Sequence, residues 1–171
     1  LDPLVGTSLE ALGYRPVARS GGTPLPAPSA TVTWRDGRLS APRGTVIDVG
    51  ALGKGRLVDL ILAVVGAHGS SDVVVDGSGD LAVRGAPSRV GLEHPYDPGR
   101  VIGVWEVEDA ALCASATNRR AWGDGLHHVI DARTGVPVDT VVATWAVCRD
   151  AMHADALASA LFFDQGPALA D

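Results

Sequence analysis

The sequence predicts an α+β fold: one domain over residues 1–171, with antiparallel strands in hairpins and two main helices. Two observations favour this class. Short β-prone runs at 31–34 and 38–40 flank Arg35-Asp36-Gly37, and an Asp-Gly pair is a strong hairpin signal. Apolar residues recur every three or four positions after residue 55, as in a helix, and a last helix is predicted over 152–163. Hairpins combined with two separate helices favour α+β over a repeating βαβ order.

The remaining elements follow from turn residues and apolar runs. A helix ends near residues 9–14 at Gly13, and a Pro/Gly/Ser-rich loop covers 20–30. Further strands are predicted at residues 46–49, 73–75, 81–83, 101–108 and 143–148. A glycine-rich turn at 50–55 opens the first main helix. Its expected buried face consists of Leu57, Val58, Ile61, Val64 and Val65.

Composition limits the function. The chain has 14 Lys and Arg against 20 Asp and Glu, a net charge of −6, which argues against a nucleic-acid partner. The longest apolar run, residues 60–65, is too short to cross a bilayer, so no transmembrane segment is expected. An acidic protein that handles a phosphorylated cofactor needs local neutralisation, for which a divalent metal is suited. Cys113 and Cys148 are expected as buried small hydrophobes, with a disulfide between them left open.

Two common nucleotide-binding motifs fail on inspection. A P-loop needs Gly five residues before Lys54 and Ser or Thr after it, where this chain has Val49 and Gly55. Residues 77–82 (GSGDLA) match a dinucleotide fingerprint, but a short strand follows them and not the required helix.

Four segments stand out as carriers of chemistry. They are 48–55 (DVGALGKG) with Asp59, 76–80 (DGSGD), 127–135 (HHVIDARTG) and 153–159 (HADALAS). Asp155 and Ser159 are four residues apart on a predicted helix, so they share one face. A carboxylate and a hydroxyl are hard oxygen donors suited to Mg²⁺; the alternative is a solvated helix face.

In order and spacing these segments resemble the ApbE family of FAD:protein FMN transferases. The family reads D-x-G-x-x-A-K-G-x-x-x-D, N-x-G-G-D, H-x-I-D-P-x-T-G and A-D-x-x-x-T-A. Residues 2–6 (DPLVG), 91–95 (GLEHP) and 114–118 (ASATN) are similar to further family stretches, so the resemblance covers nearly the whole chain. It implies an ApbE-like, T-fold-like fold over about the C-terminal two thirds of the family domain, with the N-terminal portion lacking.

The chain departs from the family pattern at several positions, of which the following bear on the site. Ser159 replaces a Thr but keeps a hydroxyl, whereas Asn118 replaces a Gly and Ala132 a Pro. Asp76 stands where the family has Asn, and Ser78 where it has its first Gly.

The resemblance implies roles for individual residues. The metal ligands would be the Ala51 carbonyl, Asp155 and Ser159. FAD contacts are implied at Asp2, Asp48, Lys54 and Ile130. The alternative role for Asp48 is to cap the helix that starts near Gly55. Lys54 would neutralise the pyrophosphate, and the alternative is that it is an exposed surface lysine. His128 is the candidate general base; the alternative is a structural strand histidine, with His127 pointing the other way.

The implied reaction is Mg²⁺-dependent transfer of FMN from FAD to a Thr or Ser hydroxyl of an acceptor flavoprotein, with release of AMP. Two alternatives stay open: a non-catalytic FAD-binding module, and an Mg²⁺-dependent FAD pyrophosphatase giving FMN and AMP. Family resemblance also implies an extracytoplasmic or membrane-associated location. Asp131, Thr134 and Gly135 are expected to form a turn, and Arg133 to reach phosphate or lie at the surface.

Overall fold

The computed structural model describes residues 1–14 and 22–163. Its contacts divide the chain into two compact units, neither of them continuous in sequence. The sheet unit comprises Gly50–Arg119 and the chain from Asp139 onward, together with Leu1; the loop unit comprises Asp2–Val49 and Arg120–Val138. The single domain expected over 1–171 stays a prediction.

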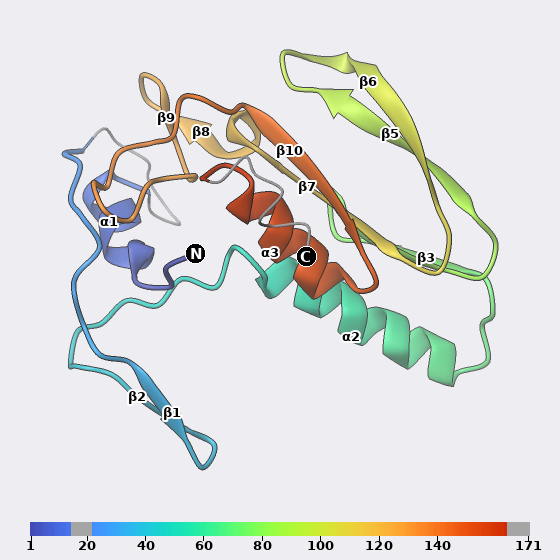
Figure 1. The fold of residues 1–171 in the computed structure, drawn as a ribbon, viewed down its shortest axis with the longest axis horizontal. Helices are drawn as coiled ribbons and strands as arrows, with labels where there is room; N and C mark the ends of the chain where they lie inside the picture. Colours follow the sequence, from blue (N-terminus) through green and yellow to red (C-terminus); the bar gives the residue numbers. More distant parts are fainter. Residues whose placement is uncertain (15–21, 164–171) are drawn as a thin grey trace. The chain divides into compact units, whose positions relative to one another are not determined.

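The sheet unit is built on a four-stranded antiparallel sheet with the strand order β10-β7-β4-β3. Its strands are β3 (Val73–Asp76), β4 (Asp80–Arg84), β7 (Ala111–Ala116) and β10 (Ala143–Cys148). Helices α2 (Gly53–Ala67) and α3 (Ala151–Ala160) lie side by side on one face of this sheet (Figure 1). The predicted α+β class is confirmed, as are the strands expected at 73–75, 81–83 and 143–148.

Side chains alternate between the two faces of the sheet. Ala82, Ala111 and Cys113 face the helices and pack with Val58 and Ala154. Their neighbours face the other way and form a second cluster, which consists of Leu81, Val83, Val107 and Leu112 with Val90, Leu92 and Trp145 packed against it. This second cluster includes residues of the hairpin of β5 (Ser88–His94) and β6 (Asp97–Val107), whose second strand contains most of the predicted 101–108 run.

The predicted buried face of α2 is right for Val58 and wrong for Leu57, Ile61 and Val64. Leu57 and Val64 are 56% and 59% exposed, and Ile61 is also exposed, whereas Val58 is buried. Gly55, Val58 and Leu62 instead face the core. The orientation of α2 about its own axis has a local cause. A Cβ on Gly55 would lie 2.1 Å from the carbonyl oxygen of Ala151, so only glycine allows α3 to approach this closely. The last helix is also shorter than predicted, because α3 ends at Ala160 and a turn follows.

The loop unit contains α1 (Val5–Ala11) and two small hairpins, β1 (Thr33–Arg35) with β2 (Arg38–Ser40) and β8 (Ala121–Trp122) with β9 (Leu126–His127). A 3₁₀ turn, η1 (Thr117–Arg120), precedes β8. The unit's core is a cluster of Leu9, Leu12, Trp122 and Ile130. The Trp122 indole N–H donates to the Leu12 carbonyl at 3.0 Å, which ties the end of α1 to the β8–β9 hairpin.

Several local predictions concern this unit. The hairpin at 31–40 is confirmed, with Asp36 and Gly37 both at positive φ, as a two-residue hairpin turn requires. The helix that ends near Gly13 is confirmed as well, since Gly13 has a φ of +84°. The strand expected at 46–49 is wrong: the structure describes this segment and assigns it to no strand, although the Asp48 N–H donates to the Pro3 carbonyl at 2.8 Å. Part of the predicted 20–30 loop lies outside the described residues.

Across the residues that the structure describes, no helix has the length and apolar character needed to cross a membrane.

Candidate functional site

The carboxylate of Asp155 lies against the beginning of α2. Asp155 is 2% exposed, and its Oδ2 accepts a hydrogen bond from the Gly55 N–H at 3.0 Å. The first N–H groups of a helix have no partner within the helix and carry partial positive charge, so they favour an anion there. The burial of Asp155 excludes the alternative of a solvated helix face.

Gly55 determines how closely this carboxylate approaches. A Cβ at this position would lie 2.1 Å from the Ala151 carbonyl oxygen and 2.9 Å from the Asp155 Cβ. Any side chain would therefore push α3 away from the start of α2. The family-like glycine at 55 thus has a packing reason in this chain.

The N-terminus of α3 is fixed by two further carboxylates. Asp59 of α2 accepts from the Ala151 and Met152 N–H groups at 2.8 and 3.0 Å. Asp150 caps the same helix by accepting from the His153 N–H at 2.9 Å, a bond that lowers the pKa of Asp150. Sequence analysis named Asp59 within a motif without giving it this role, because only the packing of two helices creates it.

Ser159 lies one turn beyond Asp155 on α3, and its Oγ is 3.3 Å from the Oγ of Ser115 on β7. Thr144 of β10 donates to the neighbouring Ala158 carbonyl at 2.6 Å and so holds this end of α3 on the sheet. Sequence analysis placed Ser115 in a family-like stretch but gave it no function. The structure adds this hydroxyl to that of Ser159.

Ala51 lies in the turn that leads into α2, four residues before Gly55. The sheet unit therefore contains all three predicted metal ligands: the carbonyl of Ala51, the carboxylate of Asp155 and the hydroxyl of Ser159. Their donor set of hard oxygens fits Mg²⁺, which binds few protein ligands and retains water. Among residues 1–14 and 22–163 no group of three or more His, Cys, Asp or Glu side chains that could hold a metal ion occurs.

Lys54 forms an ion pair with Asp80, the first residue of β4. The Asp80 side chain is fully buried, whereas that of Lys54 is one-third exposed (34%). Within the 76–80 turn, the Asp76 carboxylate accepts from the Gly79 N–H at 3.1 Å. The Asp80 side chain instead reaches Lys54, so Lys54 is not the isolated surface lysine of the alternative reading.

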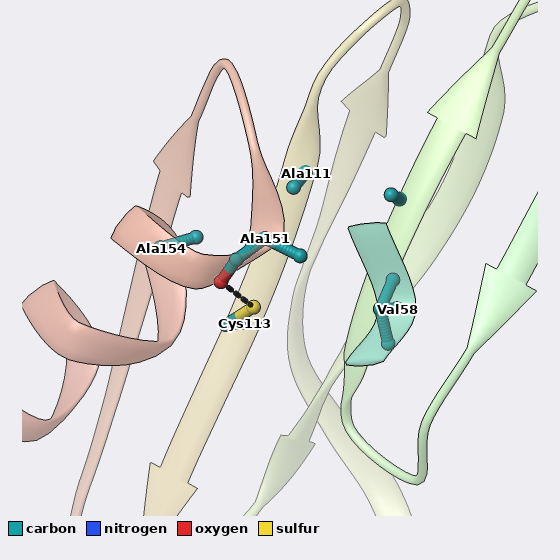
Figure 2. Packing of buried hydrophobic residues seen from close by; sticks show 6 residues of the cluster. Val58, Ala111, Cys113, Ala151 and Ala154 are labelled. Atoms are coloured by element: carbon teal, nitrogen blue, oxygen red, sulfur yellow. Dashed lines mark hydrogen bonds between the residues drawn. The ribbon is translucent and has the colours of Figure 1, made fainter. Parts of the chain in front are cut away.

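Cys113 is directly opposite Asp80 in the β4–β7 register. Its thiol donates to the Ala151 carbonyl at 3.4 Å in the core between the sheet and α3 (Figure 2). Burial, together with the negative charges of Asp80 and Asp155, raises the pKa of Cys113 far above its ordinary value. Cys113 therefore remains a neutral thiol, and both cysteines are free, which resolves the question of a disulfide between them.

In the loop unit, the two histidines differ. His127 ends β9, is 9% exposed, and accepts the Val129 N–H on Nδ1 at 3.3 Å; burial lowers its pKa. His128 is half-buried at the bend just after the strand. His127 is thus a neutral structural histidine, and the role of His128 as a base stays a prediction.

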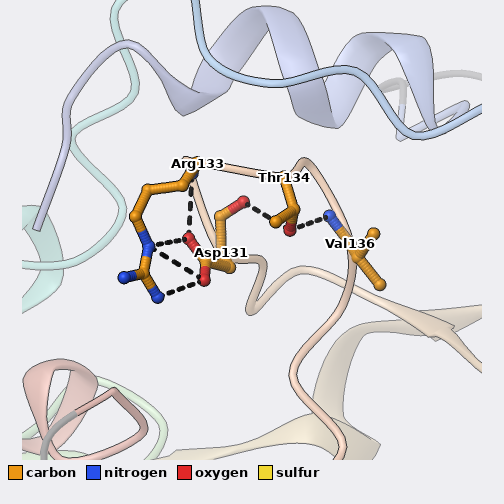
Figure 3. A network of polar contacts seen from close by, with 4 residues as sticks. All are labelled: Asp131, Arg133, Thr134 and Val136. Atoms are coloured by element: carbon orange, nitrogen blue, oxygen red, sulfur yellow. Dashed lines mark hydrogen bonds and ion pairs between the residues drawn. The ribbon is translucent and has the colours of Figure 1, made fainter.

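The segment after these histidines forms the predicted turn (Figure 3). The Asp131 carbonyl accepts from the Thr134 and Gly135 N–H groups at 3.1 and 2.7 Å, and Gly135 has a φ of +73°. Arg133 forms a 2.6 Å ion pair with Asp131, and its guanidinium holds the pKa of that carboxyl below its usual range. The exposed Arg133 side chain contacts Asp131 here, and a phosphate contact stays a prediction.

The three predicted flavin contacts of the loop unit lie in different settings. The Asp2 carboxylate accepts from the Leu4 N–H at 2.8 Å. The Asp48 N–H donates to the Pro3 carbonyl at 2.8 Å, which links Asp48 to the same stretch, and its contact with flavin stays a prediction. The Ile130 side chain is buried in the core of the unit, and a flavin contact at Ile130 stays a prediction. Asp2, Asp48, His128 and Ile130 thus belong to the loop unit, and Ala51, Lys54, Asp155 and Ser159 to the sheet unit.

Comparisons with known proteins agree with the motif reading. The sequence pattern of the ApbE family matches residues 2–171. A FAD:protein FMN transferase of Rhodobacter capsulatus is 30% identical over 94% of this chain and 34% of that protein. One of Treponema pallidum is 32% identical over 71% of this chain and 39% of its own length. The chain thus spans between a third and two fifths of these relatives.

Solved structures give the same result for the fold. The flavin transferase ApbE from Vibrio cholerae superposes with a TM-score of 0.82 at 26% identity, over 99% of this chain and 61% of that one. The ApbE protein of Thermotoga maritima gives 0.79 at 27% identity, over 94% and 58% of the two chains. With a family match over nearly its whole length, this chain belongs to the ApbE family.

Proposed function

We propose that this chain carries out Mg²⁺-dependent FMN transfer from FAD to a Thr or Ser hydroxyl of an acceptor protein, with AMP as the second product. The observation that carries the proposal is the buried Asp155 carboxylate, fixed at the start of α2 one helical turn from Ser159. The names of the relatives, FAD:protein FMN transferase, supply the substrate and the group that is transferred.

Asp155, Ser159 and the Ala51 carbonyl would hold the metal. A buried carboxylate is costly unless it is paired, hydrogen-bonded or bound to a metal, and Asp155 is also held by the Gly55 N–H. When bound, Mg²⁺ would withdraw charge from the diphosphate and make AMP a better leaving group. The sheet unit also supplies Lys54, whose ammonium would offset charge on the diphosphate.

The bond changes of the transfer are defined by its products. The acceptor hydroxyl attacks the phosphorus on the FMN side, and the bond from that phosphorus to the bridging oxygen breaks. AMP leaves with the bridging oxygen, and the hydroxyl proton passes to His128 as general base. His127 is unsuited to this step, because it is buried and its Nδ1 already accepts the Val129 N–H.

Asp2, Asp48 and the backbone at Ile130 would bind the flavin part of FAD. Carboxylates and backbone groups can accept or donate hydrogen bonds to the ribityl hydroxyls and the ring edge. The core position of the Ile130 side chain supports a backbone contact, since the cluster with Leu9, Leu12 and Trp122 fixes that backbone.

One incubation with three possible outcomes distinguishes this function from its alternatives. The chain is incubated with FAD, Mg²⁺ and an acceptor flavoprotein domain. Covalent FMN on the acceptor with AMP in solution supports the transferase. Free FMN with AMP would indicate the pyrophosphatase instead, and unchanged FAD the non-catalytic binding module.

A further inference from the structure

Among the described residues of the sheet unit, Asp80 is the most deeply buried charge that the proposed reaction does not use. Its side chain has no exposed surface, and it lies on the helix-facing side of β4, opposite Cys113. Lys54 on the first turn of α2 supplies the opposite charge through an ion pair. A buried ion pair of this kind often contributes less stability than well-packed apolar residues would, so its stability alone gives no reason for it.

The pair fixes the position of a flexible cation. A lysine has four rotatable bonds and normally samples many rotamers, and immobilising it costs conformational entropy. Here the Asp80 carboxylate at the start of β4 binds the Lys54 ammonium, while one-third of the Lys54 side chain stays exposed. Lys54 immediately precedes Gly55, whose N–H binds the predicted metal ligand Asp155 of α3, so the cation lies in the turn of α2 that contacts this ligand.

We propose that Asp80 is a positioning residue: its buried carboxylate holds the Lys54 ammonium at the start of α2, ready to contact the diphosphate of FAD. The inference rests on the proposed function. Asp80 touches no substrate and acts only through Lys54. Because the ordering of the lysine is completed when the chain folds, FAD does not have to order it on binding.

The test is a double-mutant cycle on the intact chain. FAD affinity in the presence of Mg²⁺ is measured for the wild type, Asp80→Asn, Lys54→Met and the double variant. Asp80→Asn keeps the side-chain volume and should weaken FAD binding about five- to tenfold. In the Lys54→Met background the same change should have no effect on FAD affinity. Asp76→Asn is the matched control, because it alters the same turn without touching Lys54, and it should bind FAD as the wild type does.

A second measurement keeps the inference testable if Asp80→Asn fails to fold. Lys54→Met leaves a buried, uncompensated carboxylate. Adding Asp80→Asn to Lys54→Met should therefore lower the equilibrium constant of unfolding about tenfold without changing FAD affinity.

Two results would overturn the inference. One is that Asp80→Asn weakens FAD binding equally with and without Lys54. The other is that it leaves FAD affinity unchanged in both backgrounds. A wild-type chain that binds no FAD would overturn the proposed function itself, whereas the stability of the apo variants would still report whether Asp80 and Lys54 are coupled.

Discussion

Gly55 in the first turn of α2 contacts Asp155 in the middle of α3: the glycine N–H donates to the aspartate Oδ2 at 3.0 Å, and a Cβ on Gly55 would lie 2.9 Å from the Asp155 Cβ. The absence of a side chain at 55 and the carboxylate at 155 are therefore parts of one arrangement. It places a buried anion on the unpaired N–H groups of a helix, next to Ser159 on the following turn.

Gly55→Ala should disturb both the packing and the site. The new Cβ would collide with the Ala151 carbonyl, so α3 must shift, at a cost of about 1–3 kcal/mol in the free energy of unfolding. Urea unfolding measures this loss, and calorimetry with Mg²⁺ should show weaker binding. Gly103→Ala is the control, because a Cβ there meets nothing closer than Leu92 Cδ1 at 3.7 Å. Equal stability of the two variants would refute the close approach at Gly55.

Asp155→Asn should remove Mg²⁺ binding while the fold remains. The amide can still accept from the Gly55 N–H, but it lacks the charge, so Mg²⁺ affinity should fall by roughly two orders of magnitude or more. Ser159→Ala should cost less, since water can replace a neutral ligand. Titration calorimetry checks both, with the exposed Asp97→Asn as control. Wild-type Mg²⁺ affinity in Asp155→Asn would show that the metal ligands were assigned wrongly.

His128→Ala should slow transfer and leave FAD binding nearly unchanged. Loss of a general base lowers the rate by roughly two to four orders of magnitude. Single-turnover transfer assays and FAD titration separate the two effects. His127→Ala is the comparison: its effect should be on stability, because His127 is buried. Equal loss of transfer rate in both variants, at matched stability, would contradict the choice of His128.

The stability of the chain should fall as the pH drops below about 6.5. Burial lowers the pKa of His127 from 6.5 in the folded protein, so the unfolded chain takes up a proton at a pH where the folded one does not. The free energy of unfolding therefore decreases with falling pH from about 6.5 to the folded pKa. Urea unfolding between pH 7.5 and 5 tests this. His127→Gln should flatten the slope, whereas His68→Gln, at an exposed position, should keep it; an unchanged slope in His127→Gln would count against the assignment.

Sequence reasoning succeeded where a structure depends on neighbouring residues. The 31–40 hairpin follows from Asp36-Gly37 alone, since both residues adopt the positive φ that the turn demands. The 131–135 turn is equally local, with Asp131 accepting from residues three and four positions later. The motif order also identified the family before any contact was known.

It failed where packing between distant segments decides. The apolar repeat of α2 cannot show which of its two apolar stripes is buried, because the close approach of Ala151 to Gly55 sets the rotation. The run at 46–49 has strand-forming residues, but the structure assigns it to no strand. Its β-propensity therefore predicted a strand that does not form. The burial of Asp80 and its pairing with Lys54 likewise join residues 26 positions apart, which no local pattern reports.

The origin of the oxygen atoms in the products tests the central claim most directly. The chain, FAD, Mg²⁺ and an acceptor domain are incubated in water enriched in ¹⁸O, and the labelled acceptor and AMP are analysed by mass spectrometry. Transfer predicts no ¹⁸O in either product, because the acceptor supplies the attacking oxygen and AMP leaves with the bridging oxygen of FAD. One ¹⁸O atom in FMN or AMP, without FMN on the acceptor, would mean that water is the attacking group and would contradict the transferase assignment.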